Sequence, residues 1–176
     1  MEFNKAVSNP MLMGAIELMK AEDTPEHRNM FVGELAKANF LSPAIIDPAP
    51  TEGEDGKPVI APGSKVQFPM LTGAEGMRFF MAFTDVTEYE KWQEKNPDHK
   101  LPYFALNIED YAGIVLRRDG GNICPALGIV VNPFGANIIV PREMLAGMIS
   151  AKAAQAKQII ARHATENKVT PFKPSK

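Results

Sequence analysis

Two segments that each join a short apolar run to a polar ending most constrain how this chain can fold. Residues 78–92 read RFFMAFTDVTEYEKW, and residues 128–141 read GIVVNPFGANIIVP. The apolar runs are typical of strands, and GIVV is apolar enough to be buried on both faces of a sheet. If the two strands are parallel neighbours, Thr84-Asp85 and Asn132-Pro133 end them at the same sheet edge, where strand ends and helix N-termini build ligand crevices.

The first third of the chain contains two signals that are typical of helix starts. In Asn9-Pro10 and in Thr24-Pro25, a capping residue precedes a proline that needs no hydrogen-bond donor in the first turn of a helix. We therefore predict two helices, capped by Asn9 and Thr24, followed by an extended segment over residues 39–47. A loop at 49–64, rich in Pro, Gly and acidic residues, then leads into a β-hairpin over 66–83.

The middle of the chain alternates helices with breakers. Asp85 and Glu88 have the spacing of a capping box, which predicts a helix that carries Tyr89 and Trp92 on one face. Residues 96–102 end this helix, and a loop is expected at 117–122. Between these segments, a helical stripe is formed by Ile108, Tyr111, Ala112 and Val115.

A long helix is predicted from Pro141 to about Ala164. Part of its inner stripe is formed by Leu145, Met148, Ile149, Ala156, Ile160 and His163. The order of elements predicts an α/β (α+β) single domain, with a mixed, mostly antiparallel sheet of about five strands flanked by helices. We expect residues 1–164 to form this domain and residues 165–176 to form a flexible basic tail.

Composition excludes several classes of function. The net charge of -2 gives no overall footprint for nucleic acid, and no apolar run approaches the ~20 residues that span a bilayer. A single cysteine excludes an internal disulfide, and no signal peptide is visible at the N-terminus. We therefore expect a cytoplasmic protein with no nucleic-acid or membrane partner.

Charge is unevenly distributed along the chain. From Ser150 onward there are six Lys or Arg residues and one acidic residue, whereas the preceding part carries thirteen bases and twenty acids. The basic end either seeks an acidic partner or complements the C-terminal dipole of the last helix. The even spacing of these cations favours the second interpretation.

The residue types that support common chemistries are scattered. Cys124 precedes Pro125 near a strand, and the pattern places none of His27, His99 and His163 beside it to activate the thiol. The same three histidines lack the spacing of a metal site, and no glycine-rich phosphate loop is present. We predict no catalytic residue, no metal and no cofactor.

A family resemblance is carried by four segments in order: NPMLMGAIELM, ANFLSPAII, FFMAFTDVTEYEKW, and GIVVNPFGANIIVP followed by a helix. Over roughly residues 8–149, the chain resembles the N-terminal domain of the SseB family, bacterial proteins named for enhanced serine sensitivity. The Asn-Pro-Gly turn of the family appears here one residue longer, as Asn132-Pro133-Phe134-Gly135. The resemblance implies no established enzymatic activity and supplies no catalytic residues.

The candidate binding residues gather around the predicted sheet edge: Thr84, Asp85, Trp92, Asn132, Pro133 and Phe134. The best interpretation is a non-enzymatic module that binds a protein partner or a small ligand there. The alternatives are an enzyme with an unrecognised site at Thr84 and Asn132, or an edge whose polar residues only cap and turn.

The sequence allows two alternatives for each of two interaction surfaces. Phe134 either packs back beside Tyr89 and Trp92 or is exposed as an anchor for a partner. The last helix either belongs to the core or forms the seam of a homo-oligomer.

Overall fold

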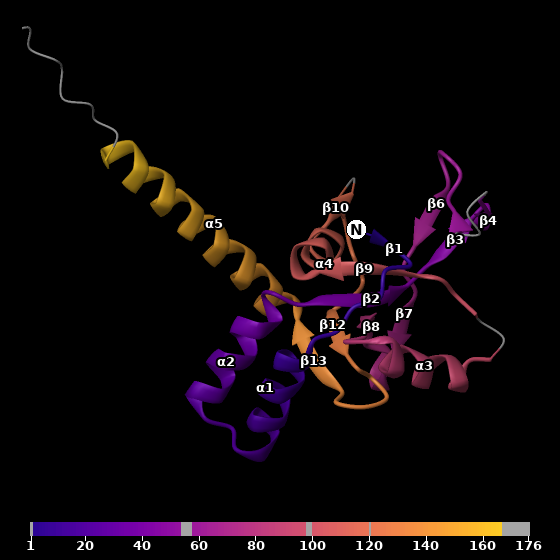
Figure 1. Ribbon diagram of the computed structural model, residues 1–176, viewed down its shortest axis with the longest axis horizontal. Helices are drawn as coiled ribbons and strands as arrows, with labels where there is room; N and C mark the ends of the chain where they lie inside the picture. The colour runs from indigo at the N-terminus through magenta and orange to yellow at the C-terminus, as the bar shows by residue number, and fades with distance from the viewer. Residues whose placement is uncertain (1, 54–57, 98–99, 120, 167–176) are drawn as a thin grey trace, which may run out of the picture.

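A four-stranded sheet and a three-stranded sheet form the body of the protein (Figure 1). The computed structural model describes residues 2–53, 58–97, 100–119 and 121–166. The four-stranded sheet has the order β13 (Ile138–Pro141), β12 (Gly128–Val131), β8 (Arg78–Ala82) and β7 (Met70–Thr72). The three-stranded sheet has the order β1 (Glu2–Phe3), β9 (Tyr103–Asn107) and β2 (Asn39–Pro43). All pairs are antiparallel except β8 with β12, which are parallel.

The two sheets meet at one antiparallel bridge. The N–H of Leu41 donates to the carbonyl of Phe83 at 2.8 Å, and the N–H of Phe83 donates back at 3.0 Å. The mixed, mostly antiparallel α+β class is therefore confirmed, although the strands divide between two bridged sheets instead of forming one sheet of about five. The pattern missed strands β1 and β9, and β9 supplies the centre of the second sheet.

Three short two-stranded ribbons form in addition to the two main sheets. β3 (Ile45–Asp47) pairs with β6 (Lys65–Gln67), and β4 (Thr51–Glu52) pairs with β5 (Pro58–Val59). The segment expected to be a loop at 117–122 contains parts of a third ribbon, β10 (Arg118–Asp119) with β11 (Asn122–Ile123). Strands β4, β5 and β10 lie in segments predicted to be loops, whereas β3 lies in the segment predicted to be extended and β6 pairs with β3 and not within the predicted hairpin.

Five α-helices complete the described part of the chain: α1 (Pro10–Ala21), α2 (Pro25–Leu35), α3 (Val86–Lys95), α4 (Ile108–Val115) and α5 (Arg142–Glu166). A short 3-10 turn, η1 (Ala74–Gly76), lies in the β7–β8 connection. Thr24 caps α2 as predicted, because its hydroxyl accepts from the N–H of His27 at 3.2 Å. Asn9 stands at the cap position of α1, but its side chain makes no capping hydrogen bond.

The core divides into two clusters. The larger lies among α1, α2, α4 and both sheets, and Tyr111 is fully buried in it with its hydroxyl donating to the carbonyl of Met81 at 2.8 Å. The smaller cluster lies beneath α3 and consists of Leu41, Met81, Phe83, Tyr89 and Trp92. The second cluster confirms the prediction that Tyr89 and Trp92 share one face of their helix.

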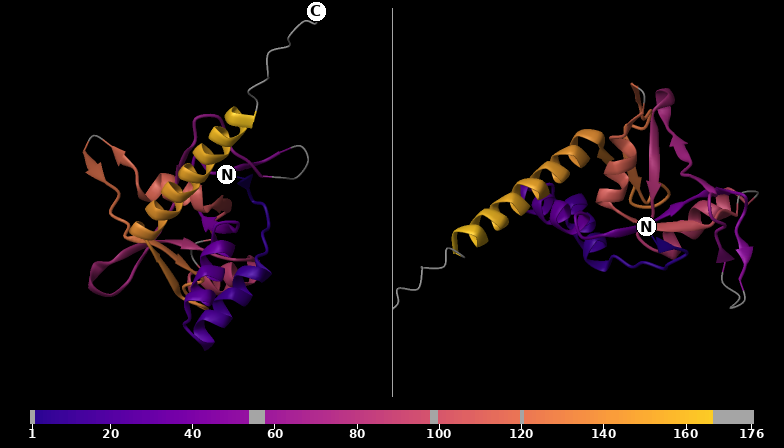
Figure 2. Two further views of the ribbon diagram at one scale, coloured as in Figure 1. Left: turned by 90° about the vertical axis from the view of Figure 1, so that its left-hand side faces the viewer. Right: turned by 90° about the horizontal axis from the view of Figure 1, so that it is seen from above.

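Helix α5 leaves the body after its first turns (Figures 1 and 2). Leu145 is completely buried and Met148 and Ile149 are half-buried, whereas every residue from 150 to 162 is exposed. The predicted inner stripe is therefore wrong at Ala156 and Ile160, because both residues are exposed and lie beyond the body that the described residues form. The side chain of His163 and residues 167–176 of the expected tail lie outside the described residues.

The two ends of α5 should respond differently to truncation of a side chain. Leu145→Ala should lower the free energy of unfolding by ~2–5 kcal/mol, since it opens a cavity in the core. Ile160→Ala is the matched control and should stay within about 0.5 kcal/mol at low protein concentration. Urea unfolding measures both, and equal losses would show that Ile160 packs on the body after all.

Candidate functional site

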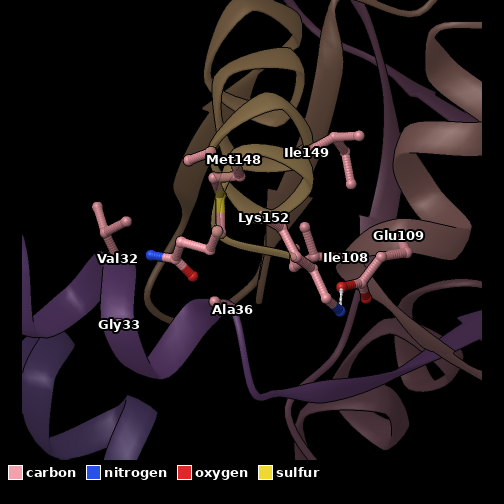
Figure 3. Close-up of a pocket in the computed structure, with 10 residues that line it drawn as sticks. Val32, Gly33, Ala36, Ile108, Glu109, Met148, Ile149 and Lys152 are labelled. Carbon is pink, nitrogen blue, oxygen red and sulfur yellow. Dashed lines mark hydrogen bonds and ion pairs between the residues drawn. The ribbon is translucent and has the colours of Figure 1, made fainter. Parts of the chain in front are cut away.

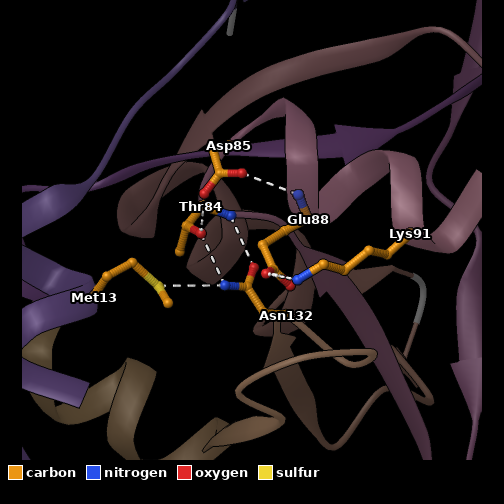
Figure 4. Close-up of polar contacts among 6 residues, drawn as sticks. All are labelled: Met13, Thr84, Asp85, Glu88, Lys91 and Asn132. Carbon is orange, nitrogen blue, oxygen red and sulfur yellow. Dashed lines mark hydrogen bonds and ion pairs between the residues drawn. The ribbon is translucent and has the colours of Figure 1, made fainter. Parts of the chain in front are cut away.

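Parallel pairing of β8 with β12 brings the two predicted signatures together (Figure 4). The register places Val131 opposite Ala82, so both strands end at the same level of the sheet. Thr84 follows β8 and Asn132 follows β12, and both residues are completely buried. The conditional prediction of a shared sheet edge is thus met in the structure.

The side chain of Asn132 connects the two strand ends. Its Oδ1 accepts from the N–H of Thr84 at 2.9 Å, and its Nδ2 donates to Oγ1 of Thr84 at 2.8 Å. The same Nδ2 lies 3.4 Å from Sδ of Met13 on α1. Burial of an amide is costly unless it is hydrogen-bonded, and here both ends of the amide have partners. We call Thr84, Asp85 and Asn132 the edge cluster.

The backbone of Asn132 starts the turn that follows β12. Its φ of 47° lies in the left-handed region, which asparagine adopts more readily than most residues. Its carbonyl accepts from the N–H of Gly135 at 2.9 Å and of Asn137 at 2.8 Å. The predicted turn role of Asn132 is therefore present together with the side-chain contacts to Thr84.

Asn9 ties the N-terminal helices to the same edge. Its Nδ2 donates to the carbonyl of Thr84 and to the carbonyl of Asn39, each at 2.7 Å. The sequence pattern assigns Asn9 to a helix cap, and these contacts explain why it does not act as one. Both acceptors lie far from Asn9 in sequence, so no local signal could have identified them.

Asp85 caps α3 as predicted. Its Oδ1 accepts from the N–H of Glu88 at 3.0 Å, and its Oδ2 accepts from the hydroxyl of Thr84 at 2.9 Å. Glu88 does not complete the expected capping box. Its carboxylate instead forms an ion pair with Lys91 on one oxygen and faces the turn after β12 on the other.

Glu88 is the polar residue at this edge whose role the sequence pattern missed. The residue is 9% exposed, and its Oε2 is buried with no hydrogen-bond partner among the described residues. A Cβ placed on Gly135 would come within 2.4 Å of that oxygen. The carboxylate and the glycine therefore fit against each other, and the fit restricts which residue the turn accepts at position 135.

The aromatic residues at the edge pack together. Trp92 is 6% exposed, and the half-buried ring of Phe134 lies against the cluster that contains it. The ammonium of Lys95 lies 4.8 Å from the centre of the Phe134 ring. Of the two alternatives for Phe134, the structure shows packing beside Trp92. Pro133 next to it is also half-buried.

The predicted site residues therefore meet, but most of their polar groups bond to one another. Thr84 and Asn132 have no exposed surface, and Asp85 serves as a helix cap. Five cavities in the described part of the chain are lined by other residues. Within that part, no group of His, Cys, Asp and Glu residues is arranged to hold a metal ion.

An apolar groove lies on another side of the body, between α2, α4 and α5 (Figure 3). It has a volume of about 340 Å³. Its lining comes from three helices and the end of one of them: Val32 and Gly33 on α2, Ala36 directly after α2, Ile108 and Glu109 on α4, and Met148, Ile149, Ala151, Lys152 and Gln155 on α5. The sequence predicts each of these helices but gives no measure of the gap between them.

One ion pair crosses the groove. Lys152 on α5 bonds to the carboxylate of Glu109 on α4, and this hydrogen bond holds the pKa of Glu109 below its ordinary value. Both side chains are partly exposed, so the pair contributes little to stability. Its effect is positional, because it draws the lysine toward the α4 wall.

A protein-family model described as the SseB protein N-terminal domain matches residues 12–147. The chain belongs to the SseB family. The match includes the edge cluster, the α2 and α4 walls of the groove and the first turns of α5, and it ends where α5 leaves the body. Comparisons with curated proteins and with solved structures gave no match. None of the helices in the described part of this SseB-family chain is long and apolar enough to cross a lipid bilayer.

The hydrogen bonds of the Asn132 side chain can be separated from its backbone strain. Asn132→Gly keeps a residue that tolerates positive φ but removes the two hydrogen bonds that the Asn132 side chain makes with the N–H and the Oγ1 of Thr84, so we expect a loss of ~2–3 kcal/mol in unfolding free energy. Asn137→Gly is the control, because Asn137 also has a positive φ, of 53°, and is exposed. Equal small effects in urea unfolding would show that the edge cluster does not stabilise the fold.

Ionisation of Tyr89 should destabilise the folded domain at alkaline pH. Burial raises the pKa of its phenol to about 12, with a further contribution from Tyr103. Because the folded state favours the neutral phenol, Tyr89 contributes to the free energy of unfolding. This contribution is complete below the unfolded pKa of ~10 and is lost as pH rises toward ~12. Between these pH values the native protein should lose more stability than Tyr89→Phe in chemical denaturation, and identical pH profiles would contradict this.

Proposed function

We propose that this SseB-family domain is a non-enzymatic protein-binding module of the bacterial cytoplasm, and that it receives a helix of its partner in the α2–α4–α5 groove. The observation that carries this proposal is the apolar surface on α5. The groove walls include Met148 and Ile149, and the exposed Ile159 and Ile160 follow farther along the same helix. Helix recognition commonly uses such a groove, with apolar residues at helical spacing as anchors.

The shape of this surface favours a protein over a small ligand. A volume of about 340 Å³ would suit a small molecule, but such a ligand would leave Ile159 and Ile160 in water. A helix laid along α5 would cover the groove and both isoleucines together. Exposed apolar surface that continues beyond a groove is characteristic of protein interaction sites.

The alternative, an enzyme at the edge of Thr84 and Asn132, has less support. An active site needs titratable groups that converge on a cavity. At this edge the amide of Asn132 and the hydroxyl of Thr84 bond to each other, and Asp85 bonds to the start of α3. We therefore propose that the edge cluster holds the fold and that binding takes place at the groove.

Site-specific photo-crosslinking in the native cell tests this function. A photoreactive residue at Ala36, which is exposed and lines the groove, should form an adduct with a protein. The matched control is the same residue at Glu90, which is exposed on α3 away from the groove. Adducts that are absent at Ala36, or equal at both positions, would contradict groove binding.

A further inference from the structure

The exposed part of α5 carries an apolar pair of residues like the pair in its first turns. Met148 and Ile149 line the groove, and Ile159 and Ile160, which are 55% and 68% exposed, lie eleven positions farther on. Eleven residues make about three turns of an α-helix, so both pairs lie on one face of α5. The face that begins in the groove therefore continues along the free part of the helix.

A helix with two equivalent apolar pairs is complementary to itself when two copies run antiparallel. Ile159 and Ile160 of each copy then lie at the level of Met148 and Ile149 of the other copy. Both copies therefore use the same patch, as a two-fold interface requires. We propose that the helix received by the groove is α5 of a second copy of this chain, with Ile159 and Ile160 packed on Met148 and Ile149 of the other copy. This inference rests on the proposed function and names its partner.

The α2 wall of the groove leaves room for a second helix. Gly33 and Ala36 line the groove, and a Cβ on Gly33 would have no neighbour within 4 Å among the described residues, apart from adjacent residues and the nearby backbone of α2. Small residues of this kind let a neighbouring helix approach closely. The tip of the incoming helix would reach this wall after packing along Met148.

The charges of α5 are compatible with this pairing. Lys152, Lys157 and Arg162 are its cations from Met144 onward to Thr165, a stretch without an acidic residue. When position 148 lies beside position 160 of the other helix, Lys152 lies within one residue of the level of the partner's Lys157. Lys157 is turned about 140° from Lys152 around the helix, so it points away from the apolar face and the two cations are kept apart. Lys152, at the middle of the apolar face, is drawn aside by Glu109.

Long-range charge also favours the arrangement. The chain before Ser150 carries thirteen basic and twenty acidic residues, and the tip of α5 is basic. In an antiparallel pair the basic tip of each helix lies over the acidic body of the other copy. Opposite potentials of this kind assist association and orient the partners.

Light scattering of the full chain over a range of concentrations tests the dimer. The native chain should form dimers, and Ile159→Glu should weaken association at least ~10-fold, because it places a charge in the apolar contact. Ala154→Glu is the matched control, since it adds the same charge to an exposed position on the opposite face of α5 and should leave the dimer intact. Circular dichroism verifies that both variants keep their helices.

Disulfide trapping tests the antiparallel register. In a Cys124→Ser background, mixing chains that carry Met148→Cys with chains that carry Ile159→Cys should give a cross-linked heterodimer. Each variant alone should link poorly to itself, because its two cysteines would lie ~16 Å apart along the pair, beyond the reach of ~7 Å between Cα atoms in a disulfide.

Two results would overturn the dimer. One is a chain that stays monomeric at every concentration, and the other is an Ala154→Glu effect as large as that of Ile159→Glu. The crosslinks from Ala36 separate this failure from failure of the proposed function. Adducts with a different protein would keep groove binding and reject the second copy, whereas no adduct at all would reject both.

Discussion

The parallel contact between β8 and β12 depends on one buried amide. Asn132 has no exposed surface, and its side chain bonds to both the backbone and the hydroxyl of Thr84. A buried amide without partners would cost several kcal/mol, so this residue strongly favours the one arrangement that satisfies it. Asn9 then binds the carbonyl of Thr84 and joins the start of α1 and of β2 to the same point. The two sheets and the N-terminal helices are all positioned relative to this edge.

The polar side chains of the edge cluster bond within the fold, so they are not free to bind a ligand at the strand edge. In open α/β sheets, a strand edge of this type commonly holds a ligand. Here the turn after β12 closes over the edge, with Phe134 packed against the aromatic cluster and Gly135 against Glu88. The same family signatures that suggest a site are therefore the residues that close it. The apolar groove that we propose for binding lies elsewhere, between α2, α4 and α5.

The parts of the fold that the sequence predicts are those with local causes. Thr24 and Asp85 are recognisable caps because each bonds within its own first turn. The meeting of Thr84 with Asn132 is also predictable, because parallel strands end at one edge. Strand β9 is not, since its short run YFALN leads directly into the cap of α4 and is paired only by distant strands. Asn9 and Glu88 likewise act on residues that sequence spacing does not bring to them.

Helix α5 shows most clearly what the apolar periodicity of a sequence does not predict. An apolar stripe indicates which face of α5 is inward, but it does not indicate where the body beneath it ends. Beyond Ser150 the helix is rich in alanine, which sustains a helix without tertiary contacts. Ile159 and Ile160 do not fit that explanation, because β-branched residues are weaker helix formers than alanine. Their exposure leaves apolar surface of the isolated chain in water, and the proposed contact along this face of α5 would remove that surface from water.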